Sequence, residues 1–380
     1  MLYLDYNATT PIDPSVRMAM LDCMEHNFAN PASKTHMMGI RNALLLEESR
    51  EVIADLIDAP SNHIYFTSGA SESNNMVLKG VADHFLGSEP VHFIVSEVEH
   101  KCILNQCEYL KNKGVEISYA PVNSKGRVEL DSITALVRPE TKLISVMAAN
   151  NETGVLMPIN EIAQYCQDNK ILFHTDAAQL VGKMPFSVQT TLVDFASFSS
   201  HKFYGPKGIG GLYCRNKAIL LNNPLIHGGG QEYGLRGGTS NLPAIIGMAK
   251  AAKIAKERVD SDSKKQKALK IKLIENLKHS VPNITVNGCT SASLPNTLNF
   301  SLCGIKSSFL MSKLKNKVAL SSGSACNSEQ QLGSHVLSAM GLDEDQIQSS
   351  IRLSFGRETT AEELDSALQH LTEIYQLSRS

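Results

Sequence analysis

Short apolar runs alternate with longer amphipathic stretches over roughly the first two thirds of the chain. Such runs are typical of buried strands, and the stretches between them have the spacing of helices. Six strands are predicted in this part: 64–67, 91–95, 143–147, 171–174, 195–198 and 211–214. Strands that are joined by helices form βαβ units, so the pattern predicts an α/β fold around a mostly parallel sheet.

The pattern changes near residue 245. Residues 245–280 are predicted to be helical, with an interruption at the polar stretch 260–263. Two later runs, 296–300 and 317–320, are predicted strands of a second sheet, and 361–377 has the apolar stripe of a closing amphipathic helix. We therefore expect a large domain over 14–257 and a smaller α+β domain built from 1–13 and 258–380.

The amino-acid composition and the net charge argue against some classes of function. The chain has 380 residues, 42% of them hydrophobic, and a formal net charge of -2, which is ordinary for a globular protein of two domains. The absence of a basic excess argues against a direct nucleic-acid partner. No apolar run reaches the length of a membrane helix, and the first residues do not resemble a signal peptide, so we expect a cytoplasmic protein without a membrane partner.

The eight cysteines, at positions 23, 102, 107, 166, 214, 289, 303 and 326, do not have the spacing of a metal site. We therefore expect no bound metal and no disulfide framework. Cys326 differs from the others because it follows the small residues of 321–325. A thiol on such a segment suits a nucleophile that moves, although a free surface cysteine without a role is the common alternative.

Lys202 is the second unusual position. Most lysines are solvated surface charges, but this one follows the apolar run 195–198 and the polar residues Ser199, Ser200 and His201. A lysine at a buried strand edge can lose its proton and attack a carbonyl carbon. Asp176 ends the predicted strand before it, where a carboxylate can pair with a protonated ring nitrogen or simply cap a turn.

Two glycine-containing segments suit an anion. Residues 66–73 form a strand, a turn of small residues and a helix start that Ser71 can cap, and helix starts attract phosphate. Residues 227–239 are rich in glycine around Arg236. Each is weak evidence by itself; together they suggest two walls around one phosphate.

Three further polar residues follow or lie in predicted strands. His100 can stack on a flat ring or move protons, and Asn151 can bond a cofactor hydroxyl; loop hydrogen bonds are the plainer interpretation of both. Arg352 has the fork that binds a carboxylate, although most strand arginines lie at the surface.

These motifs together resemble the cysteine desulfurases, which are pyridoxal-phosphate enzymes of fold type I in the class V aminotransferase group. The resemblance runs from residue 3 to about residue 357 and rests on five segments in the family's order: 3–11, 66–70, 174–177, 199–202 and 321–326. The 26-residue step from Cys326 to Arg352 is similar to the long-loop branch, the NifS and IscS type. The resemblance implies a large, mostly parallel seven-stranded sheet domain and a smaller α+β domain.

The resemblance also implies a role for each matching position. Lys202 would hold the cofactor as a Schiff base and move protons, Cys326 would carry the sulfur, and Arg352 with Asn151 would bind the substrate. The cofactor would be held by Ala70, Ser71, His100, Asn151, Asp176, Gln179, Ser199, His201 and Lys202, with Thr239 reaching the phosphate of a partner subunit in a homodimer. Ser71 replaces a threonine that is frequent in the family, and the tail after Arg352 has only 28 residues, which is short for docking an iron–sulfur scaffold.

The sequence therefore predicts conversion of L-cysteine to L-alanine with a persulfide on Cys326. Sulfur-acceptor proteins in iron–sulfur cluster assembly, tRNA thiolation or DNA phosphorothioation would receive the sulfur. The alternatives are another class V activity, such as selenocysteine lyase or aminotransferase, and a non-catalytic sulfur-relay docking protein.

Overall fold

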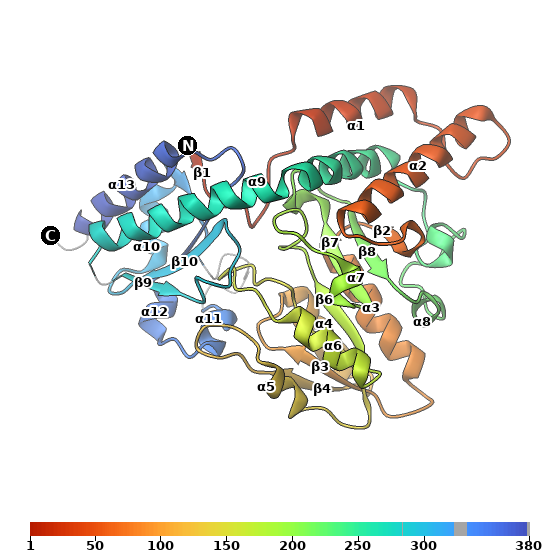
Figure 1. The fold of residues 1–380 in the computed structure, drawn as a ribbon, viewed down its shortest axis with the longest axis horizontal. Helices are drawn as coiled ribbons and strands as arrows, with labels where there is room; N and C mark the ends of the chain where they lie inside the picture. The colour runs from red at the N-terminus through yellow and green to blue at the C-terminus, as the bar shows by residue number, and fades with distance from the viewer. Residues whose placement is uncertain (283, 323–332, 378–380) are drawn as a thin grey trace.

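The computed structural model describes residues 1–282, 284–322 and 333–377. Its main body is one seven-stranded sheet with helices on its faces, joined by the long helix α9 (Leu242–Ser280) to a smaller body that contains both termini of the described chain (Figure 1). The strands of the large sheet are β2 (Ile64–Thr67), β3 (His92–Ser96), β4 (Glu116–Ala120), β5 (Thr141–Ser145), β6 (Leu172–Asp176), β7 (Phe195–Ser199) and β8 (Gly210–Cys214).

The order of these strands is β2-β8-β7-β6-β5-β3-β4. β8 runs antiparallel to both of its neighbours, and the other adjacent pairs are parallel, so the predicted mostly parallel sheet is confirmed. The sequence missed β4. It also placed β5 two residues late, because the apolar run 143–147 continues past β5 into a buried segment without regular secondary structure.

The helices that surround the sheet are α1 (Pro14–His26), α2 (Met37–Leu56), α3 (Ala70–Phe85), α4 (Lys101–Lys111), α5 (Leu130–Thr134), α6 (Ile159–Asp168), α7 (Val188–Thr191) and α8 (Ala218–Leu221), with short 3-10 turns at Ser61–His63, Ser200–Lys202 and Glu232–Gly234. Two apolar clusters fill the space between sheet and helices. One contains Ile94, Ile144 and Phe198, and the other contains Phe93, Leu143 and Phe195, so neighbouring residues on the strands face opposite sides of the sheet.

The helix α9 (Leu242–Ser280) is continuous for 39 residues, and the predicted interruption at 260–263 is wrong. Asp262 lies 3.4 Å from Arg258 one turn earlier and 3.4 Å from Arg357, so ion pairs support the helix where its residues are polar. The buried residues of α9 join the main apolar cluster up to Ala255 and a separate cluster from Leu273 onward. One helix therefore contributes to both cores.

The smaller body has a three-stranded antiparallel sheet in the order β12-β10-β9. Its elements are β9 (Ile284–Asn287), β10 (Thr297–Leu302), β12 (Ser350–Ser354), α10 (Ser307–Leu314), α11 (His335–Ala339), α12 (Glu344–Gln348) and α13 (Ala361–Leu377). The closing helix has the bounds that the sequence predicted. The predicted strand at 317–320 does not join this sheet, because β11 (Val318–Ala319) pairs in parallel with β1 (Leu2–Tyr3) instead.

The segment after β1 crosses from the smaller body to the main one. Ser354 donates its backbone N–H to the Leu4 carbonyl at 2.9 Å, and Thr10 donates its backbone N–H to the His201 carbonyl at 3.0 Å. The side chain of Asn7 bonds Thr297 at 2.8 Å. Residues 4–10 therefore lie between the two bodies. Among the described residues, none of the helices is both long and apolar enough to span a bilayer.

Candidate active site

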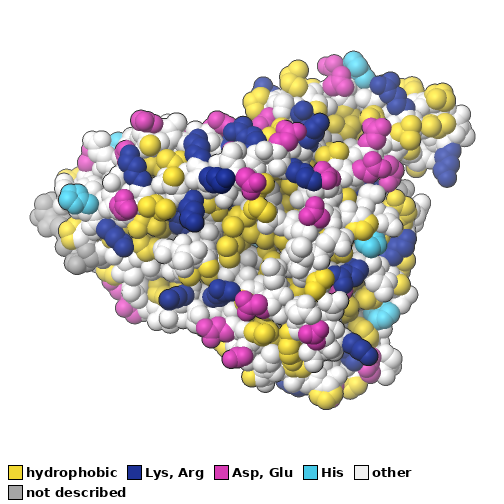
Figure 2. Space-filling view, viewed as in Figure 1, with side chains coloured by type: hydrophobic (Ala, Val, Ile, Leu, Met, Phe, Trp, Pro, Cys, Tyr) yellow, Lys and Arg dark blue, Asp and Glu magenta, His cyan; other side chains and the backbone are white. Residues whose placement is uncertain are grey.

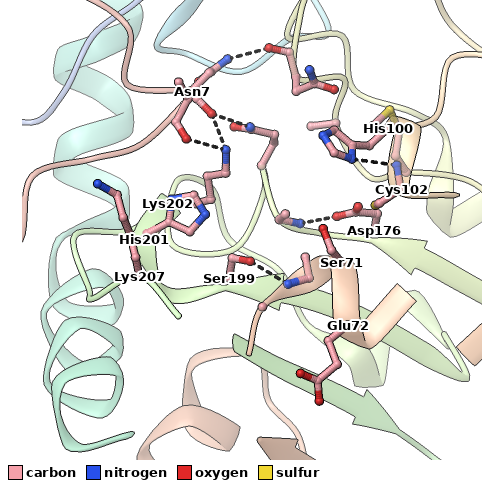
Figure 3. Close-up of a pocket in the computed structure, with 18 of the residues that line it drawn as sticks. Asn7, Ser71, Glu72, His100, Cys102, Asp176, Ser199, His201, Lys202 and Lys207 are labelled. Carbon is pink, nitrogen blue, oxygen red and sulfur yellow. Dashed lines mark hydrogen bonds between the residues drawn. The ribbon is translucent and has the colours of Figure 1, made fainter. Parts of the chain in front are cut away.

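A cavity of about 520 Å³ opens near the carboxyl ends of β2, β6 and β7. This is the edge at which open α/β sheets bind their ligands. Ten of the predicted site residues line it: Ala70, Ser71, His100, Asn151, Asp176, Gln179, Ser199, His201, Lys202 and Arg352. Figure 3 shows several of them converging from the α3 and α4 helix starts, from β6 and from the segment around Lys202. Segments that are distant in sequence thus contribute to a single site.

The start of α3 forms one wall of the cavity. Its N-cap is Gly69, which provides no side-chain cap, and Ser71 is the second helical residue; the prediction that Ser71 caps this helix is wrong. The Ala70 N–H donates to the Ser199 hydroxyl at 2.7 Å, which ties the helix start to β7 (Figure 3). A Cβ on Gly210 would lie 2.5 Å from the Gly69 Cα, so the turn packs closely on β8. An uncapped helix start that faces a cavity suits an anion.

Lys202 ends the 3-10 turn after β7, and its side chain extends across the cavity toward the N-terminal segment (Figure 3). Its Nζ donates to the carbonyls of Asn7 at 2.5 Å and Ala8 at 3.0 Å. Its amine is therefore held inside the cavity rather than in solvent, unlike that of an ordinary surface lysine.

Asp176 ends β6, and its carboxylate is buried at the cavity wall. Oδ1 accepts from the Ala178 N–H at 2.9 Å, and Oδ2 accepts from the side-chain amide of Asn74 at 2.7 Å. Both carboxylate oxygens thus accept a hydrogen bond, which fixes the direction of the group. Asp176 can therefore face a cationic nitrogen in the cavity.

The two histidines of the cavity are neutral. His100 is the N-cap of α4, and its Nδ1 accepts from the Cys102 N–H at 3.2 Å, so this nitrogen carries no proton. Burial lowers the pKa of His100, and the charge of Lys202 lowers it further, while Asp176 acts in the opposite direction. Burial and the charges of Lys202 and Lys207 lower the pKa of His201 to about 4.

Arg352 also lines the cavity, where it projects from β12 with 4% of its surface exposed. Its Nη1 donates to the Asn151 carbonyl at 3.0 Å, and its Nη2 donates to Asp5 at 2.6 Å. Its buried Nε has no hydrogen-bond partner among the described residues. This guanidinium is thus held in place and retains a donor for an anionic ligand.

The glycine-rich segment 227–239 does not line the cavity of its own chain, so the two walls around one phosphate stay a prediction that involves a partner subunit. Arg236 pairs with Glu72 of α3 at 2.9 Å, which brings the segment to the outside of the helix start. Thr239 is exposed to solvent there. Cys326 lies outside the described residues.

Sequence reasoning missed three residues that organise the site. Asn7 accepts from Lys202, Lys183 and Gln179, and Asn74 bonds Asp176. Burial, together with the charges of Lys202 and Arg352, lowers the pKa of Lys183 well below its usual value. Lys183 lies four residues after Gln179 in a run of turns and donates to its side-chain oxygen at 2.6 Å.

The chain matches the family model described as aminotransferase class-V over residues 2–367. It is 42% identical to a human protein named cysteine desulfurase over 99% of this chain and 83% of that one. It is 43% identical to an Arabidopsis thaliana protein named cysteine desulfurase, mitochondrial, over 97% and 81%. A solved structure titled NifS-like protein superposes with a TM-score of 0.92 at 39% identity and covers 99% of both chains.

Proposed function

This chain belongs to the class V aminotransferase family and, within it, to the cysteine desulfurases, and from that premise we propose that it takes sulfur from L-cysteine and leaves L-alanine. Enzymes of this family depend on pyridoxal phosphate. The observation that carries the proposal is the convergence of Lys202, Asp176 and the start of α3 on one cavity.

The residues present fit pyridoxal phosphate. The start of α3 has no side-chain cap and faces the cavity, and Ser71, Ser199 and His201 surround it, so a phosphate has donors there. Asp176 offers its carboxylate to a ring nitrogen, and His100 provides a flat neutral ring. Asn151 and Gln179 line the remaining wall and supply amides for the ring hydroxyl. When bound, the cofactor supplies an electron sink for bond changes at the α-carbon of the substrate.

The protein side chains then bind the substrate and move its protons. Lys202 would hold the cofactor, and its amine would carry a proton to and from the α-carbon of the substrate. Arg352 binds the substrate carboxylate, with Asn151 beside it. Neutral His100 stays next to the ring and is available to exchange a proton.

The thiolate of Cys326 attacks the sulfur of the bound cysteine. A sulfur–sulfur bond forms as the carbon–sulfur bond breaks, and the electron pair of the broken bond stays on carbon, which is protonated to the methyl group of alanine. The sum is L-cysteine plus the Cys326 thiol giving L-alanine plus the Cys326 persulfide. Atoms and electrons balance without another reactant.

The purified protein, loaded with pyridoxal phosphate and given L-cysteine and a thiol acceptor, should form alanine and sulfane sulfur in equal amounts. An aminotransferase would instead form a keto acid and need an amino-group acceptor. A selenocysteine lyase would act on selenocysteine and leave cysteine nearly untouched, and a docking protein without catalysis would release no alanine. Quantifying alanine, keto acid and persulfide in one reaction separates these outcomes.

We also propose that the enzyme is a homodimer. Large apolar side chains are exposed on the arm formed by α1 and α2, where Figure 1 shows the two helices projecting from the main body and Figure 2 shows yellow side chains across it. They include Met18, Leu21, Met24, Phe28 (74% exposed), Met37, Met38, Ile40 and Leu44. An apolar surface of this kind is typical of a protein interface. Thr239 lies outside its own cavity, which agrees with a role in the partner's site.

Replacing Leu44 with glutamate should place a charge in this interface and shift the protein from twice the chain mass to the chain mass in analytical ultracentrifugation. The monomer should also retain pyridoxal phosphate less well, because it lacks Thr239 of the partner. Ile271, which is 49% exposed on α9, is the matched control, and its glutamate variant should stay dimeric. A wild-type protein that sediments as a monomer contradicts the proposal.

The remaining assignments are also proposals. The main apolar cluster comes mostly from residues 14–257 and the separate cluster from Leu4 and residues from 273 onward, which supports a large domain over 14–257 and a small one over 1–13 and 258–380, joined within α9; Leu294 and residues 336, 337 and 340 of the small domain pack into the main cluster. The near-neutral charge supports protein acceptors of sulfur, rather than direct binding to nucleic acid, in cluster assembly, tRNA thiolation or DNA phosphorothioation. We propose a cytoplasmic location, although the Arabidopsis relative is named mitochondrial. Following labelled sulfur from Cys326 in an extract identifies the acceptor.

A further inference from the structure

Asp176 belongs to a buried polar cluster beneath the cavity. Its closest side-chain partner is Asn74, which lies on α3 with none of its surface exposed. The Asn74 Nδ2 donates to Asp176 Oδ2 at 2.7 Å and lies 3.3 Å from the Cys102 sulfur. The Asn74 Oδ1 has no hydrogen-bond partner among the described residues. The amide therefore directs both of its N–H groups at the cluster and leaves its oxygen unpaired.

The orientation of this amide follows from the charge of Asp176. If the amide were reversed, Oδ1 would face the carboxylate, and two acceptors would meet without a proton between them. An unpaired buried acceptor lowers stability. The observed orientation is favoured nevertheless, because it turns an N–H donor toward the anionic carboxylate. Asn74 thus fixes the direction of the Asp176 carboxylate, which the Ala178 N–H holds from its other side.

Glu99 is a second buried acid in the cluster. It follows β3, none of its surface is exposed, and it does not line the cavity. Its Oε1 accepts from the Met147 N–H, but its Oε2 has no partner among the described residues. Burial raises the pKa of Glu99 well above its ordinary value, and the charge of Asp176 raises it further.

The groups that face Glu99 do not supply a positive charge to offset its burial. Asp176 approaches it from β6, and Cys102 and Cys107 interact with it from α4. His335 of α11 bonds its backbone carbonyl at 3.0 Å, and burial lowers the pKa of that histidine. Two carboxyl groups in one buried cluster do not both lose their protons unless a nearby positive charge compensates for their burial. Asp176 has two donors and Glu99 has one, so the negative charge resides on Asp176.

We propose that Asn74 is a positioning residue for Asp176 and that Glu99 retains its proton, so that the cluster presents a single, fixed negative charge to the cavity. This inference rests on the proposed function, in which that charge pairs with the ring nitrogen of pyridoxal phosphate. Asn74 and Glu99 act only through Asp176, since neither lines the cavity.

The first test uses the cofactor-free protein and infrared difference spectra over a pH series. The wild type should show the carbonyl stretch of a buried protonated acid at neutral pH, and Glu99→Gln should remove that band while the protein stays folded. Glu152 is also buried, with its pKa raised by burial to about 7, so the series is recorded in a Glu152→Gln background. An unchanged band in Glu99→Gln overturns the assignment of the proton.

The second test follows Asn74. In Asn74→Ala, the Asp176 carboxylate loses a hydrogen-bond donor, so its carboxylate stretching bands should shift in the same spectra. The dissociation constant for pyridoxal phosphate should rise about tenfold. Asn74→Ser, which keeps a shorter donor, should lie between this variant and the wild type, and it serves as the test if the alanine variant does not fold.

Asn75 provides the matched control, because it lies next in sequence and its amide donates to the Ser71 carbonyl instead. Asn75→Ala should leave the carboxylate bands unshifted and keep the dissociation constant within about twofold of wild type. If Asn74→Ala matches this control in both measurements, the positioning role is wrong. A wild-type protein that does not bind pyridoxal phosphate would contradict the proposed function. The infrared series would still show whether Glu99 carries a proton.

Discussion

Replacing Lys202 with alanine is expected to abolish the covalent attachment of pyridoxal phosphate and to lower alanine formation from cysteine by at least about 10³-fold. The structure places the Lys202 amine inside the cavity, where the carbonyls of Asn7 and Ala8 hold it. The same amine both holds the cofactor and moves the proton in our proposal, so its removal affects two functions together. Borohydride reduction followed by peptide mapping measures the attachment directly.

Lys183 is a second amine near Lys202, so the peptide mapping must distinguish attachment at one lysine from attachment at the other. Its pKa is lowered well below the usual value, and its Nζ bonds Gln179 and Asn7 next to Lys202, so it is a second amine with nucleophilic character. Our proposal requires the reduced cofactor on the peptide that contains Lys202. Cofactor found on Lys183 in the wild type would contradict it. Lys253→Ala, on the exposed side of α9, controls for loss of a positive charge and should retain full attachment.

The sheet and most of the site were predictable because their signals are local. Buried strands of a mostly parallel sheet are apolar on both faces, so runs such as 195–198 are visible without knowledge of the fold. Asp176 and Lys202 follow such strands directly, and strand ends of a parallel sheet meet at one edge. The sequence therefore placed these two residues in one site before any contact between them was known.

The errors involve contacts between distant segments. β1 pairs with β11, more than 300 residues away, and a two-residue strand has no periodicity to detect. The ion pairs of Asp262 join α9 to Arg357, and no local pattern distinguishes that stretch from a loop. Asn7 is similar: its partners Thr297 and Lys202 come from different parts of the chain. These features depend on contacts between residues that are far apart in the sequence. No short stretch of sequence indicates which residues will meet.

The segment 4–10 contacts both the residues that we propose bind the substrate and the residues that we propose hold the cofactor. Asp5 holds Arg352 at 2.6 Å, Asn7 holds Lys202 at 2.5 Å, and Thr9 bonds the His201 ring at 3.2 Å. The segment turns at Tyr6–Ala8, where the Ala8 N–H bonds the Asp5 carbonyl at 3.0 Å, and Lys202 is held by the backbone carbonyl of Asn7. The proposed carboxylate anchor, the proposed cofactor lysine and the proposed phosphate residue are thus positioned by one short stretch of backbone.

Replacing Cys326 with serine is expected to eliminate the protein persulfide and to lower alanine formation by about 10³-fold or more, while the cofactor stays bound. A serine hydroxyl is a slightly smaller replacement for the thiol and does not form a persulfide. The measurement is mass spectrometry of peptides after reaction with L-cysteine, with blocking of free thiols. In the wild type, one extra sulfur atom should appear on the peptide that contains residue 326.

Cys102 is the matched control, because it is the cysteine that lines the cavity among the described residues. Burial raises the pKa of its thiol to about 12, and the charge of Asp176 adds to the effect, so at neutral pH it is protonated and a poor nucleophile. Proximity to the substrate alone therefore does not make Cys102 the nucleophile. We expect Cys102→Ser to keep the persulfide on residue 326. A persulfide on Cys102, or alanine released at the native rate by Cys326→Ser, would show that the thiol inside the cavity takes the sulfur.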